Sequence, residues 1–141
     1  NYDKIDKPAS APKVYFNRPG KLRGRVAALK WATREDTGQE YAVLELEVTD
    51  PGTTDHEAGE LVSWAKAHGK NQYNAREIKG MVAAVLGVPF EGCTSDLMLD
   101  AFSPENAAGL VGTVLDVHVV EKQTDKGVFH NAHFKHVAPP A

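Results

Sequence analysis

The chain contains a single cysteine, Cys93, so neither an internal disulfide nor a CxxC metal motif can form. No apolar run approaches the roughly 18 residues that would span a bilayer. The sequence also has no P-loop, no GxGxxG, no GxSxG and no HExxH motif. These absences favour a non-enzymatic protein without a cofactor or a membrane span. A reducing cytoplasm suits its one cysteine, for which we expect an inert or buried thiol.

Charge is unevenly distributed along the chain, although the composition is that of an ordinary globular domain. The net charge is -3. Residues 1–34 hold nine Lys or Arg against two Asp, whereas the remaining 107 residues carry seven basic and seventeen acidic groups. Such a chain can present a local positive surface to a polyanion. Alternatively, neighbouring opposite charges neutralise one another once the chain has folded.

Alternation of apolar and polar residues predicts five strands. We expect them over residues 21–31, 40–49, 60–66, 112–122 and 128–137. Gly24 would allow the first strand to bend or bulge, and Arg23, Arg25 and Trp31 should share one of its faces. A loop over residues 123–126 would place residue 122 opposite residue 127 in the last hairpin. The inward positions are expected to include Leu44, Leu46, Leu115 and Val117.

One long helix is predicted between the third and fourth strands. Asn74 is a good N-cap, and Glu77 stands three residues later as in a capping box. An apolar stripe follows at helical spacing: Ile78, Met81, Val82, Val85 and Leu86. Gly87 and Pro89 then end the helix. Shorter helical turns are expected after Ser95 and Ser103.

This order of elements indicates a mainly β protein with the OB-fold, a five-stranded Greek-key barrel. We expect one such domain over residues 14–137, a flexible N-terminal arm over residues 1–13 and a short tail over residues 138–141. In OB-folds the second and third strands, with the loops joining strands one to two and four to five, bind oligonucleotides or oligosaccharides.

The histidines are the best candidates for metal chemistry. His130, His133 and His136 are spaced by three, which separates them on a strand. His118 can lie near His133 across the last hairpin, but two ligands are only the beginning of a metal site. We therefore predict no metal site, and a metal-dependent nuclease or other hydrolase is kept as an alternative.

A groove for single-stranded nucleic acid needs basic side chains along the backbone and flat rings on which bases stack. Residues of both kinds lie on strands one to three, their loops and the last hairpin. The predicted binding residues are Arg23, Arg25, Lys30, Trp31, Arg34, Tyr41, Trp64, Lys66, Tyr73, Lys122, Lys126 and Phe129. Each aromatic residue has an alternative place in the core, which the pattern favours for Trp64. Glu45 and Glu47 argue against a uniformly positive second strand.

Several segments resemble those of a known family. They are Leu22–Trp31, Tyr41–Val48, Gly59–Trp64, Ile78–Gly87 and the closing hairpin from Gly112 to Asn131. Over about residues 20–137 the chain is similar to small phage-encoded single-stranded DNA-binding proteins with an OB-fold. The family's basic and aromatic positions would map to Arg23, Arg25, Trp31, Trp64, Lys66 and Phe129.

The resemblance implies a protein of the host cytoplasm that coats single-stranded DNA, without strong sequence preference, during phage DNA replication or recombination. Replication or recombination proteins and a second copy of the chain are its candidate protein partners. DNA stacked on Trp31 or Trp64 should quench their fluorescence. The main alternative is an OB-fold module that binds a protein in a phage or host assembly.

Overall fold

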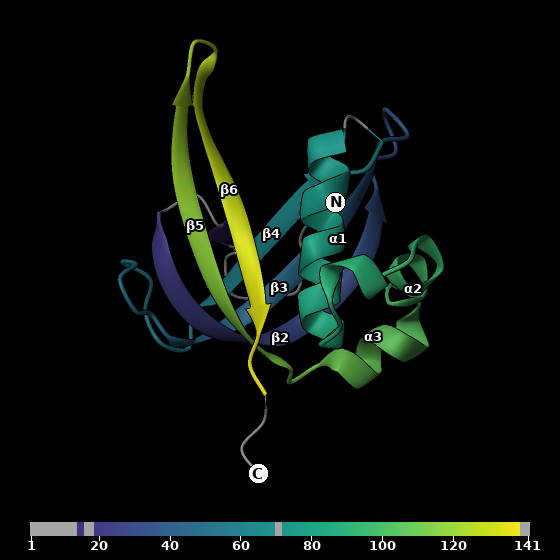
Figure 1. The fold of residues 1–141 in the computed structure, drawn as a ribbon, viewed down its shortest axis with the longest axis horizontal. Helices are drawn as coiled ribbons and strands as arrows, with labels where there is room; N and C mark the ends of the chain where they lie inside the picture. Colours follow the sequence, from purple (N-terminus) through teal and green to yellow (C-terminus); the bar gives the residue numbers. More distant parts are fainter. Residues whose placement is uncertain (1–13, 16–18, 70–71, 139–141) are drawn as a thin grey trace, which may run out of the picture.

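The computed structural model describes residues 14–15, 19–69 and 72–138. The expected arm over residues 1–13 and most of the expected tail lie outside these ranges. The structure is mainly β, with one curved sheet and a group of helices beside it (Figure 1). No helix in the described ranges is long and apolar enough to cross a membrane.

The strands are β1 (Val14–Tyr15), β2 (Gly20–Thr33), β3 (Glu40–Asp50), β4 (Leu61–Ala67), β5 (Val114–Thr124) and β6 (Gly127–His136). The helices are α1 (Gln72–Leu86), α2 (Ser95–Asp100) and α3 (Pro104–Leu110), with a 3-10 turn at Phe90–Gly92. The five strands predicted from the sequence are β2 to β6. The long helix and both shorter helical turns are confirmed as well.

The sheet is open, with the strand order β1-β4-β3-β2-β5-β6. Strands β2 to β6 pair only in antiparallel fashion, and β1 adds a short parallel pairing to β4. An OB barrel would close by pairing β4 with β6. That pairing is not present among the described residues, so barrel closure is not confirmed.

Helix α1 lies between β4 and β6, the two strands that would have to pair with each other to close a barrel (Figure 1). One carboxylate connects all three elements: Glu77 Oε1 is 3.0 Å from Lys66 Nζ on β4, and Glu77 Oε2 accepts a 3.1 Å hydrogen bond from the Ala132 N–H on β6. Below this carboxylate, the rings of Trp64 and Phe134 meet edge to face at 5.2 Å. The helix therefore fills the place where strand pairing would have closed the barrel.

The predicted start of α1 is wrong by at least three residues. The helix already includes Gln72, so Asn74 is inside it and is not the N-cap. The Asn74 side chain instead donates to the carbonyl of Ala67 at 3.1 Å, which ties α1 to the end of β4. Glu77 correspondingly reaches to the strands and makes no capping box.

The core lies between α1 and the concave side of the sheet, as the alternation predicted. The inward strand residues Leu44, Leu46, Leu115 and Val117 are at most 1% exposed. The apolar stripe of α1 meets them with Ile78, Met81, Val82 and Val85, all of which are also buried. Burial of these side chains is the main contribution to stability that the sequence pattern identifies.

Strand β2 changes face at a bulge, whereas the sequence indicates a bend or bulge only at Gly24. The register with β3 shifts between Arg23 and Gly24 and again between Val26 and Ala28. At the second shift Ala27 is an extra residue, so the side-chain alternation is reversed from Ala28 onward. Leu29 consequently points into the core, and Trp31 faces the same side. The prediction that Trp31 shares a face with Arg23 and Arg25 is wrong.

The last hairpin has a tighter turn than predicted. Thr124 pairs with Gly127 and Lys122 with Phe129, whereas residue 122 was expected opposite 127. The Thr124 hydroxyl stabilises the two-residue turn, because it accepts from the Lys126 N–H at 3.2 Å and donates to the Gly127 carbonyl at 3.1 Å. The register differs by two residues, and an even shift leaves every side chain on its predicted face.

Candidate nucleic-acid interface

The face of the sheet that points away from α1, called the outer face here, carries two rows of polar side chains across β2, β5 and β6. In one row Lys21 lies beside His118, which is opposite His133. In the next row Arg23 lies beside Asp116, which is opposite Lys135. These six side chains come from three strands and from sequence positions more than a hundred residues apart, and only the sheet brings them together.

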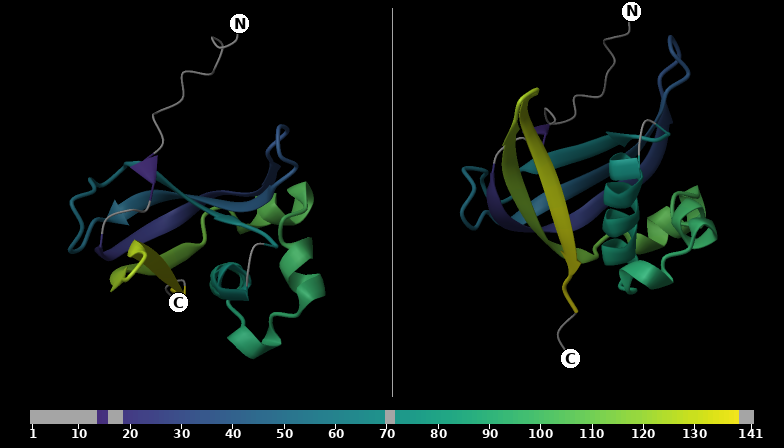
Figure 2. Two further views of the ribbon diagram at one scale, coloured as in Figure 1. Left: turned by 90° about the horizontal axis from the view of Figure 1, so that it is seen from above. Right: turned by 45° about the horizontal axis from the view of Figure 1, so that its top comes forward.

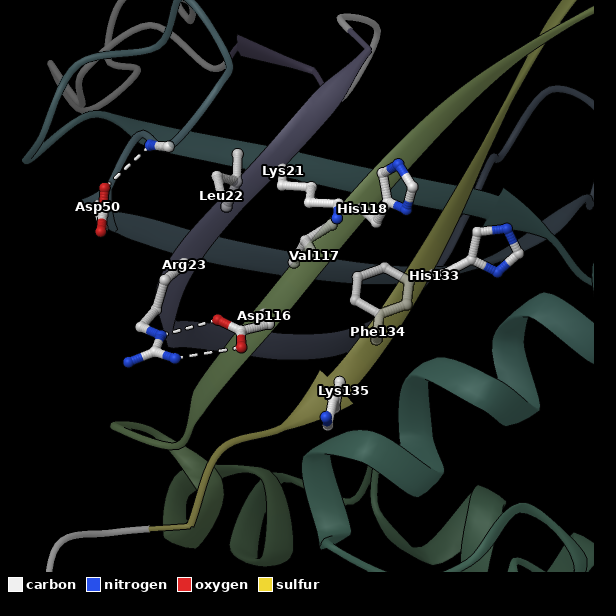
Figure 3. Close-up of a pocket in the computed structure, with 11 residues that line it drawn as sticks. Lys21, Leu22, Arg23, Asp50, Asp116, Val117, His118, His133, Phe134 and Lys135 are labelled. Atoms are coloured by element: carbon white, nitrogen blue, oxygen red, sulfur yellow. Dashed lines mark hydrogen bonds and ion pairs between the residues drawn. The ribbon is translucent and has the colours of Figure 1, made fainter.

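A surface hollow of about 590 Å³ lies over these rows (Figure 3). Its lining combines the six polar residues with Leu22, Asp50, Gly52, Val117 and Phe134. The loop after β3 forms one wall, where the Thr53 N–H donates to the Lys21 carbonyl at 2.9 Å. Gly52 is required there, because a Cβ at this position would lie 2.1 Å from the Lys21 carbonyl oxygen. The volume is in the range of sites that hold a small ligand or one unit of a polymer.

Within the hollow the charges are only partly neutralised. Asp116 accepts two hydrogen bonds from the Arg23 guanidinium, at 2.7 and 3.2 Å, and this contact is the main cause of the lowered pKa of Asp116. The same bond raises the pKa of Arg23. Lys21 and Lys135, in contrast, have no ion-pair partner within the described part of the chain. The hollow therefore presents two uncompensated lysines beside one matched pair.

The two histidines of the outer face were expected to be neighbours, and the structure confirms it. Their ring centroids are 6.5 Å apart. A third metal ligand is lacking: no group of three or more His, Cys, Asp or Glu side chains that could hold a metal ion occurs among the described residues. His130, on the opposite side of β6, lies 3.8 Å from Glu121 instead.

The outer face continues onto a hairpin arm, residues 120–131, which projects past α1 and the neighbouring strands (Figures 1 and 2). Lys122 lies opposite Phe129, and the Phe129 side chain is 49% exposed. Because strand side chains alternate, Glu121 and His130 fall on the other side of the arm. The outer side of the arm thus combines an exposed ring with Lys122, which has no ion-pair partner among the described residues, and Lys126 lies in its turn.

Three other predicted binding residues are held in ion pairs. Arg25 contacts Glu47 at 2.8 Å, Lys30 contacts Glu45 at 3.3 Å and Arg34 contacts Asp36 at 2.9 Å. Neutralisation by neighbouring opposite charges, the second interpretation of the charge distribution, therefore applies to the outer face of β2 and β3. Tyr41 is half-buried on the same side of β3.

The remaining predicted residues lie away from the outer face. Trp31 packs edge to face against Phe102 at 5.1 Å and His68 at 4.9 Å. Trp64 is 4% exposed in the core, as its pattern favoured, and Lys66 is paired with Glu77 on the core side of β4. Tyr73 is exposed, but it is in the first turn of α1. The structure does not bring these four residues together with Arg23 or Phe129.

Four residues of the outer face are missing from the predicted set: Lys21, His118, His133 and Lys135. The signal that identifies three of them is strand alternation, because His118, His133 and Lys135 share a face of the last hairpin with Phe129. Lys21 joins them only through the pairing of β2 with β5, which pattern alone does not reveal.

Comparison with known proteins adds no assignment: no family model matches the chain, and no curated protein is significantly similar to it.

Proposed function

We propose that the protein binds single-stranded DNA, without strong sequence preference, along the outer face of β2, β5 and β6 and the outer side of the arm. Phe129 is the observation that carries this proposal. A half-exposed phenyl ring opposite Lys122, on an arm that projects into solvent, gains little from burial and is open to a ligand. It suits a base stacked on the ring with a phosphate near Lys122.

The polar rows of the outer face extend this contact into a path. Four residues of β6 separate Phe129 from His133, which is roughly 13 Å at the usual rise of a strand. Lys122, Lys21 and Lys135 supply uncompensated positive charge along that path, and the hollow at its end is open to solvent. Contacts between lysine side chains and the DNA phosphates do not distinguish one base from another, so we expect weak sequence preference.

The topology supports an OB-type interpretation of this surface. Strand β5 returns to lie beside β2, and this order, β5-β2-β3-β4, supports the Greek-key connection that we propose. In an OB-fold the arm would correspond to the loop joining strands four and five, one of the usual binding loops. Together with the resemblance, this leads us to propose a role in phage DNA replication or recombination, in the host cytoplasm.

Fluorescence anisotropy of labelled oligo-dT tests the proposal. Binding should weaken as salt rises, because phosphate contacts release counterions. Phe129→Ala should weaken binding about fivefold or more, since one stacked base contributes about 1–3 kcal/mol. Lys122→Glu should also weaken it and should lower the salt dependence.

Tyr73→Ala is the matched control, because Tyr73 is an exposed aromatic residue that lies off the outer face. It should leave affinity unchanged. No binding of oligo-dT at low salt would overturn the proposal. Equal losses for Phe129→Ala and Tyr73→Ala would remove the arm from the binding site.

A protein-binding role is the second candidate, and the ion pairs of β2 and β3 favour it. Arg25–Glu47 and Lys30–Glu45 make that part of the outer face nearly neutral, so it attracts a DNA backbone weakly and does not oppose contact with a protein. A protein captured by the chain in the absence of nucleic acid, and lost on Arg25→Glu with Lys30→Glu, would support this role. The same variant should change oligo-dT binding little if DNA follows β5 and β6.

A further inference from the structure

Within the described ranges, no strand pairs with the outward edge of β6 along the arm. Strand β6 is the last strand in the sheet order, whereas the edge of β4 is partly covered by β1. Nearer the body, α1 covers β6: the Ala132 N–H donates to Glu77, and the His136 ring contacts the Ala84 carbonyl at 2.9 Å. The arm extends past this cover (Figure 1).

The direction of the Ala132 N–H shows which backbone groups the edge presents. In an antiparallel pair, N–H and C=O groups point alternately toward the partner strand and away from it. Ala132 points away from β5, so Val128 and His130 point away as well. No acceptor for either N–H is present among the described residues. The outward N–H and C=O groups of Val128 and His130 are therefore spaced so that another β-strand could pair with them.

The usual protections of an exposed edge are missing here. Edge strands are blunted by proline, by a bulge or by charged side chains. The edge segment Gly127–Asn131 contains no proline, no Lys or Arg and no acidic residue. Its pairing with β5 is regular, and Val128 and Phe129 are 47% and 49% exposed. A long hairpin of this kind is marginally stable without a further strand.

We propose that this edge pairs with the same edge of a second copy of the chain, in an antiparallel arrangement about a two-fold axis. With the axis at Phe129, Val128 of one copy lies opposite His130 of the other, and their outward N–H and C=O groups exchange hydrogen bonds. Gly127 then lies opposite Asn131, and Lys126 opposite Ala132. No two like charges face each other in this register.

The second copy is the occupant that the segment itself fits, because the edge is self-complementary in hydrogen bonding and residues 127–131 bring no like charges together. The pairing would make one continuous sheet from both arms, with the two Phe129 rings as neighbours on its outer side. The contact is small, so the dimer is expected to be weak and dependent on concentration. This inference does not depend on DNA binding, and it is tested in the absence of DNA.

Crosslinking through a new cysteine tests the pairing. Two Cys residues facing each other at the axis come within the distance that a disulfide needs. Cys93 is 1% exposed and burial raises the pKa of its thiol, so it does not compete. Phe129→Cys should therefore give a dimer on a non-reducing gel under mild oxidation. The matched control is Val111→Cys, which is equally exposed but lies at the far end of α3, and it should not.

Sedimentation of the unmodified chain provides the second measurement. The average mass of the sedimenting species should rise about twofold, from that of the monomer toward that of the dimer, as the protein concentration increases. His130→Pro removes an outward N–H that β5 does not use, and Val128→Lys places a charge on the edge. Both should keep the chain monomeric, with the circular dichroism spectrum of the unmodified protein.

Two results would overturn the inference. One is a monomer at every concentration together with no faster crosslinking of Phe129→Cys than of Val111→Cys. The other is a dimer that persists in both His130→Pro and Val128→Lys, since it would use another surface.

Discussion

Single residues decide how much positive charge the outer face presents. Asp116 is the clearest case, because it is the carboxylate in the middle of the two polar rows and binds the Arg23 guanidinium at 2.7 Å. Both side chains of the pair are nearly half exposed, so their contribution to folding stability is small. The larger consequence concerns the potential of the hollow, where Lys21 and Lys135 remain unpaired.

Asp116→Asn should therefore bind oligo-dT severalfold more tightly than the unmodified protein, because it frees Arg23 and removes one negative charge. The gain should shrink at high salt, where charges are screened. Asp100→Asn, at the exposed end of α2, removes the same charge away from the outer face and the arm and is the control. Anisotropy titrations of both variants at low and high salt measure the difference. An unchanged or weaker affinity for Asp116→Asn would place the bound strand elsewhere.

The same residue predicts a pH effect on stability. The pKa of Asp116 is lowered in the folded protein, chiefly by its hydrogen bond to Arg23. Its stabilising contribution is therefore complete above the ordinary Asp pKa of about 3.9 and is lost as pH falls through the lowered value. Urea unfolding should show Asp116→Asn as slightly less stable at neutral pH and equal at very low pH. If the unfolding free energies of Asp116→Asn and the unmodified protein differ equally at both pH values, the Arg23–Asp116 pair does not contribute to the pH dependence of stability.

At the scale of elements, α1 takes the place of a strand pairing. It contacts β4 through Lys66 and β6 through the Ala132 N–H, and Glu77 makes both contacts. These bonds are partly buried: the Glu77 side chain is 16% exposed and the Lys66 side chain 23%. The helix thereby holds β6 near β4, and the arm begins where this attachment ends.

Glu77→Ala should lower the free energy of unfolding by about 1.5–3 kcal/mol, the range for hydrogen bonds to a charged group. It leaves the Lys66 ammonium and one backbone N–H without partners. Glu91→Ala, on the exposed 3-10 turn, should change stability by less than about 0.5 kcal/mol. Urea denaturation of the two variants makes the comparison. Equal stabilities would show that α1 is held by its apolar stripe alone.

At the scale of the whole molecule, the sheet separates two populations of aromatic residues. Trp31 and Trp64 are on the side that meets the helices, whereas Phe129 lies on the outer side of the arm. This placement reverses the expectation that bound DNA quenches tryptophan. If the strand follows the outer face, neither indole is in contact with a base.

Tryptophan emission should therefore stay nearly constant when oligo-dT binds, although it should change strongly on unfolding. The measurement is a fluorescence titration in which anisotropy of the labelled DNA reports binding independently. Strong quenching that disappears in Trp31→Phe would contradict the assignment of the outer face. It would place DNA instead near the helices and the end of β2.

Alternation along the chain was sufficient for the five strands, for their inward residues outside the bulged end of β2, and for the apolar stripe of the long helix. These features depend on burial, which repeats with a period of two or 3.6 residues and can be recognised locally. The hairpin prediction shows how robust this is: its register is wrong by two residues, yet Phe129, His133 and Lys135 are on the face where alternation puts them.

Features that depend on contacts between distant segments were decided only by the tertiary structure. Ala27 is an extra residue in the pairing of β2 with β3, and the alternation of side chains reverses after it. Trp31 therefore points to the core side of the sheet. The ion pairs of Arg25 and Lys30 arise from strand pairing, and they cancel charges that the sequence presents as a basic cluster. The open sheet with α1 beside β6 likewise follows from packing. Local pattern determined which residues are buried, and only long-range pairing determined which charges and rings meet.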